Sequence, residues 1–363
     1  MGPDAAHAVL TVDLGAIVAN WRLLQAKHVS AATGAVVKAN GYGLGAVPVA
    51  TALAAAGCRH FFVATPDEAL TLRSTIPDAT LVALGGLFAG AEQDFAEHGI
   101  IPALGSLAEI ETWSRLAHRL DRALPAFVHF DTGMSRLGLD ARECAVLAQD
   151  HDQLTGIDVR CVMSHLVSAE MPDDPLNALQ RDRFVAGRAR LPPAPASLMN
   201  SAGMFLGETF GFDLARPGSA LYGINPAPLG NNPMRPVVTL SARVLAIREI
   251  PAGATVGYNA TWTAQQPRRI ATVGVGYADG WHRLHSNTGV AYFDGHPVPL
   301  VGRVSMDLTT FDITDHPAIQ PGSWLELLGP HRSVDDAARD SGGFSYEVLT
   351  ALGPRYHRVY SPA

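Results

Sequence analysis

Eight short apolar segments decide the fold: AVVKAN (35–40), HFFVAT (60–65), TLVALGG (80–86), IPALGS (101–106), PAFVHFDTG (125–133), DVRCVMSHL (158–166), PASLMNSAG (195–203) and LARPGSALYG (214–223). Each is typical of a buried strand, and segments with helical periodicity, such as LAEIETWSRLAHRL, separate them. Alternating strands and helices predict a parallel sheet with crossovers. Eight strands within about 190 residues fit a closed (β/α)8 TIM-like barrel better than an open sheet.

The sequence changes character after residue 230. The segment NPAPLGNNPMRP (225–236) is typical of a linker, and strand-like runs such as VVTLSARVLAIREI and GVAYFDGHPVPLVG follow it. We therefore predict an α/β chain with a barrel over residues 1–230 and a C-terminal mostly-β domain over residues 231–363. Residues 1–13, which include the short strand AVLTVDL, are a candidate partner of the β domain. A helix is expected to follow, with Asp13 as its N-cap.

Composition excludes several classes of protein. The 363 residues carry 27 Lys and Arg against 34 Asp and Glu, a net charge of −7, which argues against a nucleic-acid or anionic-membrane partner. The three cysteines form no CxxC pair, so neither a disulfide framework nor a metal site is expected. The N-terminus has no signal-peptide pattern and no apolar stretch reaches the length of a membrane span, so we expect a cytoplasmic protein.

Lysine is scarce in this chain. Only Lys27 and Lys38 are lysines, so 25 of the 27 basic residues are arginine. Arginine cannot lose its proton in a protein, whereas a desolvated lysine can, and then acts as a nucleophile or base. Lys38 ends the first predicted strand, at the face where barrels place their active sites. It is therefore a candidate Schiff-base lysine for pyridoxal 5′-phosphate, although strand-end lysines commonly only extend toward solvent.

Seven motifs occur in a fixed order: VVKANGYGLG, DTGMSRLG, MNSAG, RPGSALYG, VGYNATW, VGYADGW and VGRVSMD. Together they resemble the alanine racemase family, over residues 8 to about 360. The resemblance implies a pyridoxal phosphate enzyme, with Lys38 holding the cofactor and serving as one catalytic base. It also implies that Arg216 faces the pyridine nitrogen, where a guanidinium can donate a hydrogen bond but not a proton.

The same resemblance assigns the remaining cofactor contacts. Tyr42, Ser201, Gly218 and Ser219 are expected at the phosphate, with Asn200 supporting the ring or the phosphate. His165 is expected to link Arg216 to a second base through hydrogen bonds. Arg136 is expected to contact both the phenolic oxygen of the cofactor and the substrate carboxylate, in a loop that Asp131 orders.

Racemisation removes a proton from one face of a carbon and returns one to the other, so a second acid/base is needed opposite Lys38. By resemblance this is Tyr258, which reaches into the site of a partner subunit in a homodimer. The backbone of Met306, followed by Asp307, is expected to bind the substrate carboxylate from the same partner. Tyr277 matches a tyrosine that gates the entrance.

Three positions depart from the family pattern. His129 stands where many members carry a carbamylated lysine that orients the arginine; His129 itself, a chloride ion or water is a candidate replacement. Ser305 precedes Met306 where cysteine is common. Pro354 stands where another gate and phosphate-contacting tyrosine is usual, and Tyr356, two residues on, is a candidate substitute.

The resulting expectation is a two-base alanine racemase that interconverts L- and D-alanine and supplies D-alanine for peptidoglycan. A broad-specificity amino-acid racemase would share every motif and is the main alternative. A barrel-type pyridoxal phosphate decarboxylase is expected to pair the ring nitrogen with a carboxylate, which Arg216 contradicts. A non-catalytic carrier of the cofactor would lack the second domain.

Overall fold

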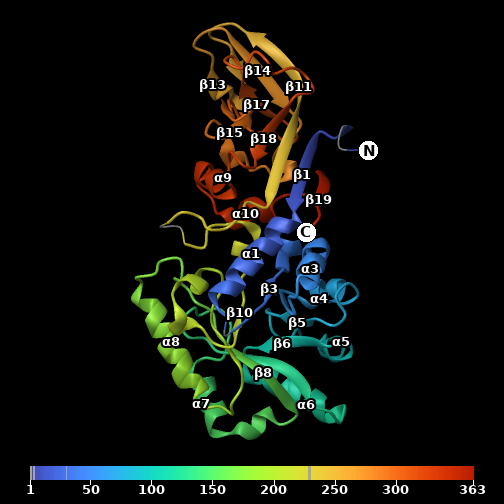
Figure 1. Cartoon of the computed structure of the whole chain (residues 1–363), viewed down its shortest axis with the longest axis vertical. Coiled ribbons are helices and arrows are strands. Elements are labelled where there is room, and N and C mark those ends of the chain that lie inside the picture. Colours follow the sequence, from blue (N-terminus) through green and yellow to red (C-terminus); the bar gives the residue numbers. More distant parts are fainter. Residues whose placement is uncertain (1, 3–4, 30, 228–229) are drawn as a thin grey trace.

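The computed structural model describes residues 2, 5–29, 31–227 and 230–363. Figure 1 shows an elongated molecule in which a barrel surrounded by helices lies at one end and a sheet-rich body lies at the other. The last strand of the chain lies between them, beside the first.

The barrel is a closed ring of short parallel strands. A continuous ladder joins β3 to β9 in sequence order, and β10 pairs in parallel with β2. The ring closes because the Asp213 amide donates to the Ala196 carbonyl at 3.0 Å and the Val36 amide donates to the Pro217 carbonyl at 2.9 Å. The bounds of these strands are β2 (Ala32–Thr33), β3 (Ala35–Val36), β4 (His60–Val63), β5 (Thr80–Ala83), β6 (Ile100–Leu104), β7 (Leu124–His129), β8 (Ile157–Met163), β9 (Ala196–Ser197) and β10 (Leu214–Ala215).

Helices follow the strands and cover the outside of the ring. Side chains that accept amide hydrogens fix the N-termini of most of them: Asp13 accepts from the Ala16 amide at 2.8 Å, as predicted, and Thr65 and Ser106 do the same for later helices, whereas α3 and α5 have no such cap. Their bounds are α1 (Leu14–Lys27), α3 (Ala46–Ala55), α4 (Pro66–Arg73), α5 (Glu92–Glu97), α6 (Leu107–Arg119), α7 (Ala141–Gln149) and α8 (Pro175–Arg188).

The second body is built mainly from antiparallel strands. Its larger sheet has the order β16-β15-β18-β11-β1-β19, and the long, bulged β11 also pairs with β14, which pairs with β17. The N-terminal strand β1 thus lies within this sheet, antiparallel to β11 and parallel to β19. The elements are β1 (Ala8–Asp13), β11 (Val238–Ile250), β12 (Thr255–Val256), β13 (Trp262–Thr263), β14 (Arg268–Val273), β15 (Val290–Phe293), β16 (His296–Pro299), β17 (Thr309–Asp312), β18 (Trp324–Leu328), α9 (Val334–Ser341), α10 (Ser345–Thr350) and β19 (His357–Ser361). The predicted fold class, a TIM-like barrel with a mostly-β domain, is confirmed.

The two bodies meet at the turn that follows β3. Arg358 donates to the Gly43 carbonyl at 2.7 Å, and the Tyr360 hydroxyl donates to the Leu44 carbonyl at 3.0 Å. A Cβ at Gly43 would overlap the backbone carbonyl of Leu349, and one at Gly45 would overlap the Tyr360 hydroxyl. Gly43 and Gly45 of the GYGLG segment are therefore needed because α10 and β19 pack directly onto this turn.

Candidate active site

A cavity of about 420 Å³ opens at the carboxyl end of the barrel strands. It is lined by eight of the residues that the sequence singled out, which come from segments far apart in the chain. These residues are Lys38, Tyr42, His165, Asn200, Ser201, Arg216, Gly218 and Ser219.

Lys38 lies two residues beyond the end of β3 and begins a short turn, α2 (Lys38–Tyr42), rather than ending the strand itself. Burial and the positive charge of Arg136 lower the pKa of its amine, although Glu68 opposes the shift. Glu68 also accepts from the Ala39 and Ala64 amides, each at 2.7 Å, so it fixes the lysine's turn to the neighbouring strand end. A lysine held in this way reaches its neutral, nucleophilic form more easily than one in water.

The turn after Lys38 is left-handed. Ala39, Asn40, Gly41 and Tyr42 have φ values of 53°, 53°, 63° and 52°. Such a conformation costs roughly 1–2 kcal/mol for each residue other than glycine. Hydrogen bonds offset part of this cost, among them one from the Ala46 amide to the Asn40 side-chain oxygen at 3.0 Å.

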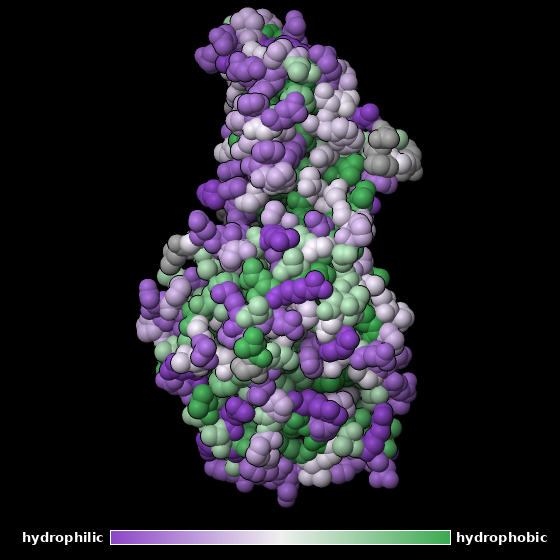
Figure 2. Space-filling view, viewed as in Figure 1, coloured by the Kyte–Doolittle hydropathy of each residue, from purple (hydrophilic) through white to green (hydrophobic). Residues whose placement is uncertain are grey.

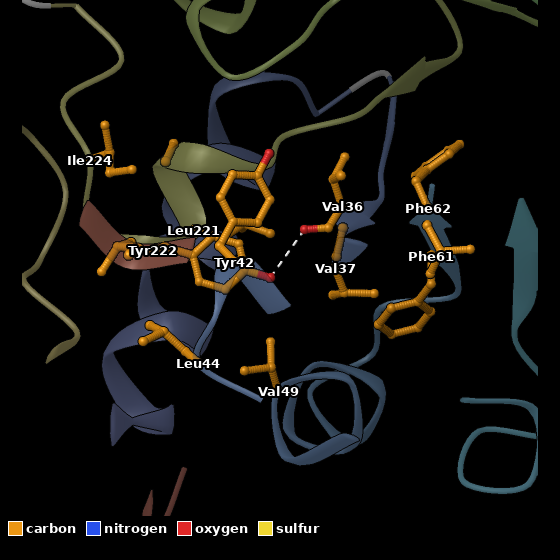
Figure 3. Close-up of a cluster of buried hydrophobic side chains, with 14 of the residues drawn as sticks. Val36, Val37, Tyr42, Leu44, Val49, Phe61, Phe62, Leu221, Tyr222 and Ile224 are labelled. Atoms are coloured by element: carbon orange, nitrogen blue, oxygen red, sulfur yellow. Dashed lines mark hydrogen bonds between the residues drawn. The ribbon is translucent and has the colours of Figure 1, made fainter. Parts of the chain in front are cut away.

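This turn presents Tyr42 to the cavity. Its ring stacks on Tyr222 with centroids 4.5 Å apart and planes 25° apart, and Figure 3 shows the pair beside Val36, whose carbonyl accepts the Tyr222 hydroxyl at 3.1 Å. Burial raises the pKa of the Tyr42 hydroxyl, so this group stays protonated and can donate. A Cβ at Gly218 would overlap that hydroxyl, which explains the glycine.

The loops after β9 and β10 form a corner rich in hydrogen-bond donors. The Ser201 hydroxyl oxygen accepts from the Gly218 amide at 2.9 Å and from the Ala220 amide at 3.2 Å. The Asn200 side-chain oxygen accepts from the Gly203 amide at 2.9 Å, which fixes the loop that carries Ser201. With the Tyr42 hydroxyl adjacent, this donor set fits an anionic group such as a phosphate.

Arg216 is buried, with 3% of its surface exposed. It donates to the Ser164 carbonyl at 2.6 Å and to the Ser197 hydroxyl, so two neighbouring strand ends hold the guanidinium in place. Burial lowers the pKa of Arg216 to about 10, which still leaves it charged at neutral pH. It can therefore donate hydrogen bonds into the cavity but cannot release a proton there.

Two histidines near Arg216 are neutral at physiological pH. Burial and the charge of Arg216 lower the pKa of His165 to about 3 and that of His129 to about 4. Within the described part of the chain, no hydrogen bond links the His165 ring to Arg216, and the Nδ1 atom of His129 is buried without a partner. His129 therefore contributes no charge to hold Arg136. The Arg136 side chain is exposed. It borders a separate cavity of about 250 Å³, which Glu109 also lines.

These low values predict that folding becomes less favourable in acid. The unfolded chain takes up protons on histidine near pH 6.5, whereas folded His129 does so only near 4, so stability present above pH 6.5 is lost as the pH falls toward 4. Replacing His129 with Asn should reduce the acid-induced loss in the free energy of unfolding by up to about 3 kcal/mol. The contributions of His165 and His285 should remain, because their pKa values are also lowered.

Urea unfolding between pH 4.5 and 7.5 measures the effect, with His118→Asn as the control because His118 is exposed. If the free energy of unfolding of the His129 variant varied with pH as steeply as that of the unaltered chain, the lowered pKa of His129 would be contradicted.

Four predicted site residues lie outside the cavity of their own chain: Arg136 of the barrel, which borders the separate cavity, and three residues of the β domain. Tyr258, Met306 and Tyr277 belong to the β domain, with 64%, 54% and 42% of their surfaces exposed. The Met306 and Tyr277 loops pack together, since the Tyr277 amide donates to the Ser305 carbonyl at 3.0 Å. Arg355 connects the two loops through ion pairs, with Asp279 of the Tyr277 loop at 3.1 Å and with Asp307 of the Met306 loop at 2.8 Å.

The sequence did not single out Tyr346, which lines the cavity from α10. Tyr356, the candidate substitute for a tyrosine at position 354, is wrong for that role. It is 4% exposed, it does not line the cavity, and its buried hydroxyl has no partner among the residues that the structure describes. No motif marks Tyr346, because only the packing of α10 against the barrel brings it to the cavity.

Asp131 orders the loop that carries Arg136, as expected. Its carboxylate accepts from the amides of Gly133, Met134 and Ser135 at 2.9 to 3.1 Å. Burial alone would raise its pKa, but these bonds outweigh that effect and lower it. Asp131 is therefore charged and fully engaged with the backbone, which leaves it no role in proton transfer.

A closed barrel whose reactive lysine shares a cavity with an anion-binding corner, joined to a separate β domain, defines a two-domain barrel enzyme with a lysine-centred site. Residues 12–226 match the alanine racemase N-terminal domain, and residues 237–360 match the alanine racemase C-terminal domain. The chain belongs to the alanine racemase family, as the motifs predicted.

Individual relatives agree along the whole chain. An alanine racemase of Acidiphilium cryptum is 54% identical over 97% of this chain and 98% of its own length. A crystal structure of alanine racemase from Bartonella henselae with covalently bound pyridoxal phosphate has a TM-score of 0.95 and 42% identity, covering 98% of this chain and all of that one. The crystal structure of the biosynthetic alanine racemase from Pseudomonas aeruginosa has a TM-score of 0.91 and 35% sequence identity, covering 98% of this chain and 99% of that one.

Proposed function

We propose that this chain interconverts L- and D-alanine with pyridoxal phosphate, using Lys38 and the partner subunit's Tyr258 as the two bases. The predicted activity, isomerase class and cofactor are those of its family. The observation that supports the proposal most strongly is the half-buried lysine, with its lowered pKa, in the same cavity as the donor-rich corner. D-Alanine made in this way would serve peptidoglycan.

The residues present fit the cofactor. The hydroxyls of Ser201, Ser219 and Tyr42, beside Gly218, would hold its phosphate, and Lys38 would hold its aldehyde carbon. Arg216 would donate to the ring nitrogen without protonating it, with Asn200 and His165 alongside. When bound, pyridoxal phosphate supplies an electron sink that makes the α-hydrogen of an amino acid acidic.

The chain's own groups then move the proton. Lys38 takes or returns it on one face of the substrate, because burial and the charge of Arg136 lower the pKa of its amine. The partner subunit's Tyr258 serves the opposite face. Arg136 and the backbone of the partner subunit's Met306 would bind the substrate carboxylate, and Tyr277 would border the entrance. Arg216 stays charged and its guanidinium is held in place, so it would not release a proton to the nitrogen of the cofactor ring. A ring nitrogen left unprotonated would limit the competing transamination.

A homodimer would complete each site. Tyr258, Leu284, Met306 and Leu308 of the β domain are 64%, 64%, 54% and 40% exposed, so large apolar side chains are uncovered in the single chain. Figure 2 shows one face on which the β domain is mainly hydrophilic. We place the boundary between the barrel and the β domain near residue 230, with β1 assigned to the β domain.

The alternative is a racemase of broader specificity, which would share every motif. Optical inversion of a panel of L-amino acids tests this. We expect alanine to react fastest and 2-aminobutyrate, with one more methylene, to be slower by about 10-fold or more in kcat/KM, because a fitted pocket discriminates one methylene by that amount. Equal rates with larger side chains would favour the alternative. No inversion of any amino acid would contradict the proposed function.

Among the described residues, no helix is both long and apolar enough to cross a membrane.

A further inference from the structure

Tyr258 lies at the tip of a very short hairpin. Its two strands, β12 and β13, have two residues each and pair with one another. The loop between them, residues 257–261, is exposed, and within it Asn259 and Ala260 have φ values of 62° and 48°. So small a hairpin is only marginally stable by itself, so the position of the Tyr258 hydroxyl depends on what else holds this loop.

The hairpin rests on the segment that leads to Met306. A Cβ at Gly302 would lie 2.8 Å from the Val256 carbonyl oxygen, and one at Gly257 would lie 3.1 Å from the Arg303 amide nitrogen. Both glycines have positive φ values, of 79° and 75°. The backbones of the two segments are therefore in direct contact beside the second base.

Asn287 joins the two segments by hydrogen bonds. Its side-chain oxygen accepts from the Gly302 amide at 2.7 Å, and its side-chain nitrogen donates to the Thr261 hydroxyl at 3.2 Å. Among the described residues, the bond to Thr261 is the one hydrogen bond that joins loop 257–261 to a segment outside its own hairpin. Asn287 has a φ of 63°, a conformation that asparagine adopts more readily than most residues, so the backbone of its turn suits this side chain.

The same turn holds the Met306 loop at a second point. The Ser286 hydroxyl oxygen accepts from the Val304 amide at 3.0 Å, and the hydroxyl donates to the Arg283 carbonyl at 2.5 Å. The Met306 loop therefore keeps one tie to this turn without Asn287, whereas loop 257–261 keeps none within the part of the chain that the structure describes. Loss of the Asn287 side chain should consequently displace Tyr258 more than Met306.

We propose that Asn287 is a positioning residue for the second base: it holds the loop that carries Tyr258 and thereby sets where the Tyr258 hydroxyl meets the substrate. This inference rests on the proposed function, because it takes Tyr258 as the base opposite Lys38. It goes beyond that function by assigning a residue that lies in none of the seven motifs and does not line the cavity.

The two faces of the substrate separate this role from a general structural one. For the enantiomer of alanine whose α-hydrogen faces Lys38, the lysine takes the proton as the C–H bond breaks, exchanges it with solvent deuterium, and can return a deuteron to the same face. A displaced Tyr258 leaves this exchange intact and slows only the inversion. For the other enantiomer Tyr258 must remove the proton itself, so exchange and inversion fall together.

The experiment follows α-hydrogen exchange by NMR and inversion by chiral chromatography, for each enantiomer, with the cofactor-loaded enzyme in heavy water. Asn287→Gly removes both hydrogen bonds while permitting the positive φ. It should slow inversion by about 10-fold, because small displacements of a reacting group are costly. The ratio of exchange to inversion should rise by the same factor for one enantiomer and stay unchanged for the other. Asn287→Asp, which can accept from the Gly302 amide and the Thr261 hydroxyl, should restore both rates.

A second readout needs no turnover. In Asn287→Gly, amide hydrogen exchange measured by mass spectrometry should become faster in residues 257–261 and 302–304 and stay unchanged in the barrel strand β4. When Tyr258→Phe is already present, Asn287→Gly should add little further loss of inversion, because both changes act through one hydroxyl.

Asn232→Gly is the matched control, since the Asn232 side chain likewise accepts from an amide, that of Met234 at 2.9 Å, and donates to the Gly223 carbonyl at 2.8 Å. It should leave the ratio unchanged for both enantiomers. In Asn287→Gly, an equal fall in the exchange of both enantiomers or an unchanged ratio for both would overturn the inference, and so would full additivity with Tyr258→Phe or failure of the aspartate variant to restore the rates. If the unaltered enzyme neither exchanged nor inverted either enantiomer, the proposed function itself would be wrong.

Discussion

Replacing Lys38 with Ala is expected to abolish racemisation, with a loss of at least about 10³-fold, because one residue both attaches the cofactor and moves the proton. The same change should remove the visible absorbance of lysine-bound pyridoxal phosphate. Both readouts are needed, since the absorbance reports attachment and the optical inversion of alanine reports turnover.

This chain offers an unusually clean control, because Lys27 is its only other lysine. Lys27 lies in the last turn of α1, where its amine is 4.3 Å from the centre of the Phe205 ring. Lys27→Ala should therefore keep both absorbance and turnover. After borohydride reduction, mass spectrometry of the unaltered chain should find the pyridoxyl group on Lys38. A label on Lys27, or a retained absorbance band in Lys38→Ala, would show that the cofactor assignment is wrong.

Replacing Tyr258 with Phe should lower racemisation by about 10²- to 10⁴-fold, the usual contribution of a positioned acid/base. Because Tyr258 is 64% exposed in the single chain and does not line its own cavity, it can act only if a second copy brings it to a site. Cofactor absorbance should be retained in this variant, since none of the cavity residues is changed.

Mixing the two inactive variants tests whether sites are shared. In a dimer that pairs Lys38→Ala with Tyr258→Phe, one site keeps both Lys38 and the partner subunit's Tyr258, while the other site lacks both. If subunits exchange freely, about half of the dimers are hybrids with one intact site of two, so about a quarter of the normal activity should return. Failure to recover activity, with exchange verified by differently tagged subunits, would argue against shared sites.

Local sequence signals predicted the barrel well because its strands are fully buried and bounded by helices. The apolar runs around Phe61, Leu81 and Phe127 correspond to β4, β5 and β7, and all three side chains are at most 2% exposed. Helix α7 was not identified, although Asp140 and Glu143 form a capping box at its start that the sequence contains. Its apolar side is weak, since only Leu147 is buried.

The cavity residues on the barrel strands were predicted from motifs, whereas contacts made across the fold were not. Glu68, which fixes the turn after Lys38, occupies an ordinary position in the first turn of α4. Tyr346 and Glu170 are 176 residues apart in the chain, so no local pattern pairs them. The left-handed turn at Ala39 and Asn40 could not be predicted either, because residues other than glycine rarely adopt this conformation and the Glu68 contact to the Ala39 amide comes from another helix.

The position of β1 has a consequence for biosynthesis. This strand is translated before the barrel, but its neighbours β11 and β19 begin at Val238 and His357. The nascent chain must therefore carry an unpaired, apolar strand while the entire barrel is translated, and both of its edges stay open to aggregation during that time. A chaperone that shields the N-terminal segment during translation should raise the yield of native protein more than one that acts after release.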